Sequence, residues 1–146
     1  MDSQQVLAEL RALDLPVDQY VVVGGAALSI RGLRSTEDID LVVVPILFDK
    51  LKSAGWRQKT RPNGAPGLKR GCVEIYLDVN TESFGRSIDW LIAHAEIMEG
   101  VPLVDLETLM GWKKTYGREK DTRDVELLER VLREKAGAPI QSSDGR

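Results

Sequence analysis

Hydrophobic residues along this chain change between strand-length runs and helical spacing, and the change predicts a mixed α+β fold. Tyr20–Val23 is an unbroken β-branched and aromatic run, typical of a strand buried on both faces. Ile39–Val44 is a second strand of this kind. Between them, Gly24–Gly25 lets the backbone turn sharply, and a short apolar helix ends at Gly32. We therefore expect a strand, a tight turn, a short helix and a second strand in succession.

Apolar residues at helical spacing predict further helices in the rest of the chain. Ser3, Asp105 and Asp121 are suited to cap three of them, because their side chains can accept hydrogen bonds from free backbone N–H groups. The predicted helices are Gln4–Leu13, Ile46–Ala54, Ser87–Ala95, Leu106–Tyr116 and a last helix that begins at Asp121.

Three further segments have the patterns of strands and turns. Trp56–Thr60 fits a short strand, and the Pro- and Gly-rich stretch Arg61–Gly67 fits a loop. Cys72–Val79 alternates apolar and polar residues, which predicts a strand with an acidic front. Glu96–Val104 predicts a short hairpin that turns at Gly100. Together these elements predict a small mixed sheet flanked by helices, with a helical pair at the C-terminal end.

Length and composition predict a single soluble domain. The chain has 146 residues, of which we assign 1–135 to one domain and 136–146, rich in Gly, Pro and Ser, to a flexible tail. No apolar run is long enough to cross a membrane, and the first residues do not resemble a signal peptide. Cys72 is the single cysteine, which excludes an internal disulfide framework. We expect a cytoplasmic protein.

The net charge of −3 hides one basic segment. Between positions 50 and 70 the chain has seven basic residues and no acidic one: Lys50, Lys52, Arg57, Lys59, Arg61, Lys69 and Arg70. Two interpretations remain open, a solvated helix face followed by a solvated loop, or a basic rim for a phosphate-bearing partner.

Two carboxylates on the second strand are the strongest sign of chemistry. Asp38 and Asp40 are two residues apart, so their side chains share one face, roughly 6–7 Å apart at the backbone. Like charges held this close favour a cation between them. Mg²⁺ is the candidate, since it takes carboxylate and phosphate oxygens together, and two ions can act in one phosphoryl transfer. A third carboxylate would complete the site, with Asp78 as the first choice and Glu74, on the same face, as the reserve.

The segment before these carboxylates is suited to phosphate. Gly24–Gly25 lies after a strand and before a helix, where backbone N–H groups can approach a phosphate closely. Arg34, Ser35 and Thr36 add a guanidinium and two hydroxyls just before Asp38.

These residues carry a family resemblance. Val23-Gly24-Gly25, twelve intervening residues and then Asp38-Ile39-Asp40-Leu41 resemble the signature of the polymerase-β-like nucleotidyltransferase superfamily. The surrounding sequence resembles the minimal nucleotidyltransferases, which include antibiotic nucleotidyltransferases and AbiEii-type toxins. The C-terminal stretch with Lys113, Lys120, Asp121 and Asp124 resembles a helical pair of the same group.

The resemblance implies a nucleotidyltransferase fold and residue roles within it. Gly24 and Gly25, with Arg34 and Thr36, would bind the nucleotide, and Lys113 and Lys120 would reach phosphate or brace acidic groups. Asp38 and Asp40 would bind two Mg²⁺ ions, with Mn²⁺ as a substitute, and Asp78 would be the third ligand and general base. Many relatives carry Ser where this chain has Gly25.

Two functions follow from this reading. The first is an enzyme that moves a nucleoside monophosphate from an NTP to a hydroxyl and releases pyrophosphate. The second is a catalytically weak module of the same fold that regulates or binds, as half of a toxin–antitoxin pair or as a subunit that needs a dimer or a partner chain. The acceptor stays open between small molecule, RNA and protein.

Overall fold

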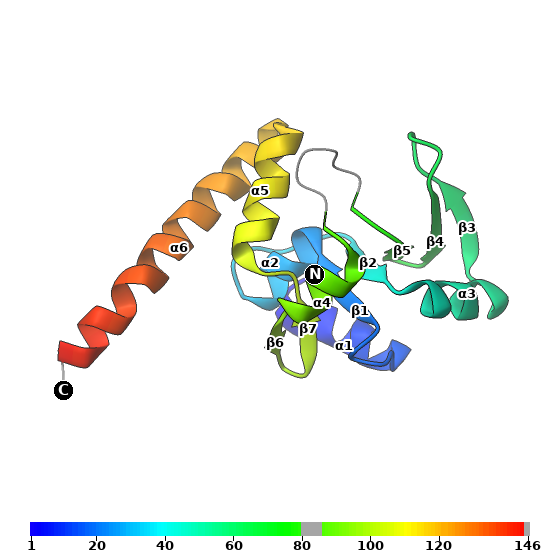
Figure 1. Cartoon of the computed structure of the whole chain (residues 1–146), viewed down its shortest axis with the longest axis horizontal. Coiled ribbons are helices and arrows are strands. Elements are labelled where there is room, and N and C mark those ends of the chain that lie inside the picture. Colours follow the sequence, from blue (N-terminus) through cyan, green and yellow to red (C-terminus); the bar gives the residue numbers. More distant parts are fainter. Residues whose placement is uncertain (80–85, 145–146) are drawn as a thin grey trace. The chain divides into compact units, whose positions relative to one another are not determined.

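The computed structural model describes residues 1–79 and 86–144, with side chains up to Gly137 (Figure 1). Its backbone divides into two compact units. One, the sheet unit, contains residues 1–79 and 86–105, and the other, the helical unit, contains residues 106–144. No helix in the described part is both long and apolar enough to cross a membrane. The boundary of a single domain at residue 135 stays a prediction.

The sheet unit is built on one mixed sheet of seven strands, which confirms the predicted fold class. Their order across the sheet is β3-β4-β5-β2-β1-β7-β6. The strands are β1 (Tyr20–Val23), β2 (Ile39–Val43), β3 (Arg57–Thr60), β4 (Pro66–Arg70), β5 (Val73–Tyr76), β6 (Glu96–Met98) and β7 (Val101–Leu103).

Strand β1 lies in the interior of the sheet because all four of its residues are apolar and buried. It pairs antiparallel with β2, in a register that joins Val22 to Leu41 and Val23 to Asp40. On its other side it runs parallel to β7. The unbroken run therefore predicted this strand correctly, and the register carries Asp40 to the end of β1 where the glycine turn begins.

Four helices belong to the sheet unit: α1 (Ser3–Leu13), α2 (Gly24–Ile30), α3 (Pro45–Ser53) and α4 (Ile88–Ala93). Helix α1 packs on α2, and α2 contacts both β1 and β2. The predicted cap of α1 is wrong by one residue. Asp2 caps it, because its carboxylate accepts the Gln5 N–H while the Gln5 side chain accepts the Asp2 N–H.

The hairpin β3–β4 and strand β5 differ from the prediction. Strand β4 was expected to be loop up to Gly67, because Pro66 and Gly67 are typical turn residues, but Pro66 is tolerated as the first residue of a strand. Strand β5 ends at Tyr76 rather than Val79, since its pairing with β4 ends where Tyr76 meets Gly67. Asp78 therefore lies beyond the strand on which it was predicted.

The helical unit contains the predicted pair, α5 (Leu106–Tyr116) and α6 (Glu119–Asp144), which pack against each other. Helix α6 begins before Asp121, whose carboxylate accepts the Arg118 N–H from within the first turn. Helix α6 continues to Asp144, through most of the segment 136–146 that the sequence analysis assigned to a tail. The flexibility of that tail stays a prediction.

Candidate active site

The glycine turn after β1 lies against the carboxylate of Asp40. Gly24 has φ +64°, a left-handed conformation that favours glycine. A Cβ placed on it would lie 3.3 Å from Oδ2 of Asp40. The first glycine therefore satisfies two requirements, the backbone turn and room for a carboxylate. The structure brings together two residues that the sequence analysis placed in one site.

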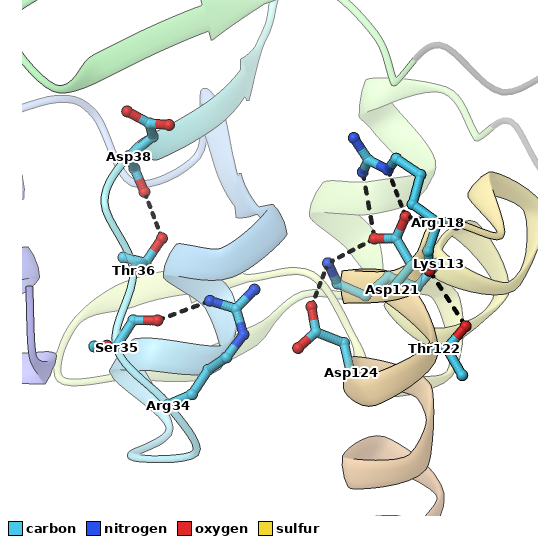
Figure 2. A network of polar contacts seen from close by, with 9 residues as sticks. All are labelled: Arg34, Ser35, Thr36, Asp38, Lys113, Arg118, Asp121, Thr122 and Asp124. Atoms are coloured by element: carbon cyan, nitrogen blue, oxygen red, sulfur yellow. Dashed lines mark hydrogen bonds and ion pairs between the residues drawn. The ribbon is translucent and has the colours of Figure 1, made fainter.

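The second glycine is packed by the loop that leads into β2. A Cβ on Gly25 would lie 2.6 Å from Oγ1 of Thr36, and 3.1 Å from the nearest guanidinium nitrogen of Arg34. The Thr36 hydroxyl also donates to the Asp38 carbonyl at 3.0 Å (Figure 2). Four predicted site residues thus meet at this turn. Thr36 and Arg34 occupy the space into which a serine side chain at position 25 would project.

Met1 holds this loop in place, which the sequence analysis missed. The Thr36 N–H donates to the Met1 carbonyl at 3.0 Å, and the Met1 nitrogen donates back to the Thr36 carbonyl. The Ser29 hydroxyl of α2 donates to the same Met1 carbonyl at 3.1 Å. Nothing in the local sequence pattern of Met1 indicates such a role, because the contact depends on tertiary structure.

The two carboxylates of the Asp-x-Asp pair differ in exposure. Asp38 precedes β2 and is exposed, whereas Asp40 is on the strand and half-buried. Between them Ile39 is fully buried, so Asp40, the next residue of the strand, lies on the opposite face of the sheet from Ile39. Both acids lie at the start of β2, close to the glycine turn.

Glu74, the reserve candidate for the third carboxylate, is the neighbour of Asp40 across the sheet. Strands β2 and β5 run parallel, and their register pairs Asp40 with Glu74. Paired residues of adjacent strands have side chains on the same face. Glu74 forms an ion pair with Lys59 and accepts a hydrogen bond from the Tyr76 hydroxyl, so it is held by two donors.

The environment of Glu74 keeps it ionised. Burial alone would raise the pKa of Glu74, but hydrogen bonds from Lys59 and Tyr76 outweigh burial and lower it. Burial, followed by the hydrogen bond to Glu74, raises the pKa of Tyr76 to about 12. The Tyr76 hydroxyl therefore remains a donor at neutral pH, and Glu74 remains a carboxylate.

Asp78, the first choice for the third carboxylate, has a different partner. Arg61 binds it twice, through the carboxylate at 2.6 Å and through the backbone carbonyl at 3.2 Å. The Asp78 side chain is 60% exposed, and it lies past the end of β5. The register of the sheet pairs Glu74, not Asp78, with Asp40.

The donor chemistry of this region suits a hard divalent cation, since carboxylate oxygens are its preferred ligands. Within residues 1–79 and 86–144, however, no three carboxylate, histidine or cysteine side chains are grouped closely enough to hold a metal ion. Three protein ligands are therefore not preassembled in this part of the chain. The metal-binding role of Asp38, Asp40 and a third acid stays a prediction.

In the helical unit, Lys113 is the centre of a buried ionic network. Its ammonium lies 2.9 Å from a carboxylate oxygen of Asp124 and 3.6 Å from one of Asp121 (Figure 2). Arg118 binds the other oxygen of Asp121. Burial would raise the pKa of Asp121, but Arg118 and Lys113 lower it. The Lys-and-Asp-x-x-Asp pattern thus joins α5 to α6.

Lys113 and Lys120, both predicted to bind the nucleotide, have different surroundings. Lys113 is buried and neutralised by two aspartates, as expected of a structural ion pair. Lys120 is exposed. Both roles stay predictions.

Comparison with known proteins identifies the fold. No protein-family model matches the chain, and no curated protein matches it. Among solved structures, ANT(2″)-Ia in complex with adenylyl-2″-tobramycin aligns with a TM-score of 0.52 and 16% identity, over 96% of this chain and 92% of the other. The solution structure of the antibiotic-resistance factor ANT(2″)-Ia aligns with a TM-score of 0.50 and 18% identity over the full length of both.

The chain has a nucleotidyltransferase fold. At 16% and 18% identity the structural similarity establishes the fold alone, and any chemistry has to be argued from the residues of this chain. Within this nucleotidyltransferase fold, the glycine turn, the loop from Arg34 to Thr36 and the start of β2 come together as the Gly-Gly…Asp-x-Asp pattern predicted.

The packing of Thr36 on Gly25 predicts coupling between the two positions in a double-mutant cycle. Gly25→Ala alone is expected to destabilise the protein by about 1–3 kcal/mol, because its methyl group would overlap the Thr36 hydroxyl. In a Thr36→Ala background the same change should cost about 1 kcal/mol less, because only the Arg34 guanidinium, at 3.1 Å, still lies against the methyl group. Urea unfolding of the four proteins measures this coupling, and additive effects would contradict the contact.

The ionic network predicts a large difference between two adjacent lysines. Lys113→Met should lower the free energy of unfolding by about 3–5 kcal/mol, because it removes the cation that Asp121 and Asp124 share in a buried site. Lys114→Met is the matched control and should change it by less than about 0.5 kcal/mol, since Lys114 is exposed. Equal effects in chemical denaturation would show that the network is not buried as described.

Proposed function

We propose that this chain is a nucleotidyltransferase, which moves a nucleoside monophosphate from an NTP to a hydroxyl and releases pyrophosphate. The observation that carries the proposal is the meeting of Asp40 with the Gly24 turn and of Thr36 with the Gly25 turn. A turn that suits phosphate and a carboxylate that suits a metal then lie together, where β1 ends and β2 begins. The fold shared with ANT(2″)-Ia supports the same reading.

In this proposal the chain's own residues bind and orient the nucleotide. Backbone N–H groups of Gly24 and Gly25 and the side chains of Arg34 and Thr36 hold the triphosphate, and the Met1 backbone keeps that loop in position. Asp38 and Asp40 hold Mg²⁺ with phosphate oxygens as further ligands. The metal, when bound, supplies positive charge at the phosphates and lowers the pKa of an oxygen nucleophile.

For the third carboxylate we propose Glu74. Its register beside Asp40 supports it over Asp78, which is tied to Arg61 outside β5. Lys59 neutralises Glu74 in the absence of other ligands, which explains how two carboxylates are tolerated side by side. In this proposal Glu74 would be a ligand of Mg²⁺ together with Asp40, and the ion would supply positive charge between the two carboxylates.

Loss of one metal-binding carboxylate is expected to abolish transfer without unfolding the protein. Asp40→Asn should reduce transfer from a labelled NTP by about 100-fold or more, the scale of removing one preorganised electrostatic group. Asp49→Asn, a matched change at an exposed position of α3, should leave transfer intact. Full transfer by a folded Asp40→Asn protein would contradict the mechanism.

The choice of third carboxylate predicts an order between two isosteric variants. Glu74→Gln should weaken Mg²⁺-dependent NTP binding strongly, because it removes the charge beside Asp40. Asp78→Asn should weaken it much less, since this acid is bound to Arg61. Calorimetric titration with NTP and Mg²⁺ measures both affinities, with Glu37→Gln as the control at an exposed acid. The reverse order would restore Asp78 as the third ligand.

A second function remains supported by one observation. The described residues form no preassembled three-ligand metal group, and Lys59 occupies Glu74. A nucleotidyltransferase fold that binds or regulates without strong catalysis, alone, as a dimer or with a partner chain, would have such a site. If calorimetry detects no binding of any NTP with Mg²⁺, this second function replaces the first.

The acceptor is also a matter of proposal. ANT(2″)-Ia was solved with an adenylylated antibiotic, so tobramycin is one acceptor to test. RNA, protein and other metabolites are the alternatives. Charged side chains on one face of the sheet bear on the choice among these acceptors.

A further inference from the structure

One face of the sheet carries a row of charged side chains that continues outward from Asp40. The register pairs Asp40 with Glu74, Glu74 with Lys69, and Lys69 with Arg57. Residues paired in this way have side chains on the same face, so the four form one line across β2, β5, β4 and β3. We call Asp40, Glu74, Lys69 and Arg57 the charged row.

A second line of side chains lies two residues along the same strands and therefore on the same face. Here Lys59 and Tyr76 both pair with Gly67, which leaves room for the Tyr76 ring. The Arg61 guanidinium carbon lies 4.6 Å from the centre of that ring, and the Lys59 ammonium lies 5.6 Å from it. The face beside Glu74 thus carries further cations around one aromatic ring.

The cations of this face differ in whether the fold already neutralises them. Lys59 is paired with Glu74, and Arg61 is paired with Asp78. Within the described part of the chain, Arg57 and Lys69 form no ion pair, although Lys69 lies near enough to Glu74 to lower the pKa of Glu74. The outer half of the charged row therefore has an excess of positive charge.

The β3–β4 hairpin places two like charges opposite each other. Arg57 and Lys69 are directly opposite each other in the β3–β4 hairpin. Like charges in this relation destabilise a hairpin. A ligand with negative charge would remove that repulsion, whereas a polycationic ligand would add to it.

We propose that the outer half of the charged row, Arg57 and Lys69, binds phosphate groups of the acceptor while its hydroxyl lies at Asp40. This inference rests on the proposed nucleotidyl transfer and names the acceptor class as phosphate-bearing. Adjacent strands are about 4.8 Å apart, so Lys69 and Arg57 lie roughly 10 and 14 Å from Asp40 along the row. In an RNA acceptor, these distances suit the phosphates one or two nucleotides upstream of the ribose whose hydroxyl reacts.

Binding of defined probes to the whole protein tests the proposal. The probes are a fluorescent single-stranded 12-nucleotide RNA, ribose 5-phosphate and spermidine. The variant Arg57→Gln/Lys69→Gln removes both cations, and Lys50→Gln/Lys52→Gln removes two exposed cations of α3 as the matched control. Arg57→Gln alone provides a second variant at an exposed position, in case the double variant is poorly folded.

We expect the RNA to bind the unmodified protein and to lose about tenfold in affinity in the double variant, because two phosphate contacts are lost. The dependence of log affinity on log salt should become shallower by about 1.4, at about 0.7 per contact on a single strand. The control variant should bind as the unmodified protein does. Titration with ATP and Mg²⁺ should give the same affinity in all these proteins.

Each other outcome is decisive. If ribose 5-phosphate but not RNA binds through Arg57 and Lys69, the phosphate site stands and the acceptor is a small phosphorylated molecule. If neither phosphate probe binds, if both double variants lose affinity equally, or if spermidine binds in place of RNA, the proposal is overturned. If RNA and ribose 5-phosphate fail to bind while an NTP still binds with Mg²⁺, the proposed nucleotidyl transfer stands. If no NTP binds with Mg²⁺, the proposed nucleotidyl transfer is refuted.

Discussion

The antiparallel pairing of β1 with β2 is the constraint on which the candidate site depends. Because the register joins Val23 to Asp40, the residue after Val23 has to turn away beneath a carboxylate. A left-handed glycine meets both needs, the conformation and the space. Any slip of one residue in this pairing would turn Asp40 into the core and bring Ile39 to the surface. Burial of the apolar residues of β2 thus positions the acid.

Several acidic groups in the described part of the chain are neutralised by cations close to them. Glu74 is bound by Lys59 and Tyr76, Asp78 by Arg61, and the buried aspartates of α6 by Lys113 and Arg118. A carboxylate that loses solvent without a partner would raise its pKa or destabilise the fold. The cations bound to Glu74 and Asp78 therefore have two functions, since they support the sheet and also set which charges a ligand meets.

Much of this could be predicted from local pattern. The run Tyr20–Val23, the glycine pair and the spacing to Asp38 and Asp40 depend on neighbours in the sequence, and the structure places them as predicted. The register of β2 with β5 could not be predicted, because it depends on a crossover between distant segments. For this reason the sequence did not distinguish Glu74 from Asp78, and strand β4 was hidden by its initial proline and glycine. No pattern in the sequence indicated that the Met1 backbone bonds to Thr36 in the loop before β2.

In the proposed reaction a nucleoside monophosphate, and not the terminal phosphate, moves from the NTP to the acceptor. Two NTP preparations, labelled at the α- or the γ-phosphate, can be incubated with the protein, Mg²⁺, RNA and tobramycin. We expect α-label to become attached to an acceptor while γ-label appears only in pyrophosphate. Attachment of γ-label to the acceptor would show phosphoryl transfer and contradict nucleotidyl transfer, as would the absence of any transfer with every acceptor and every NTP.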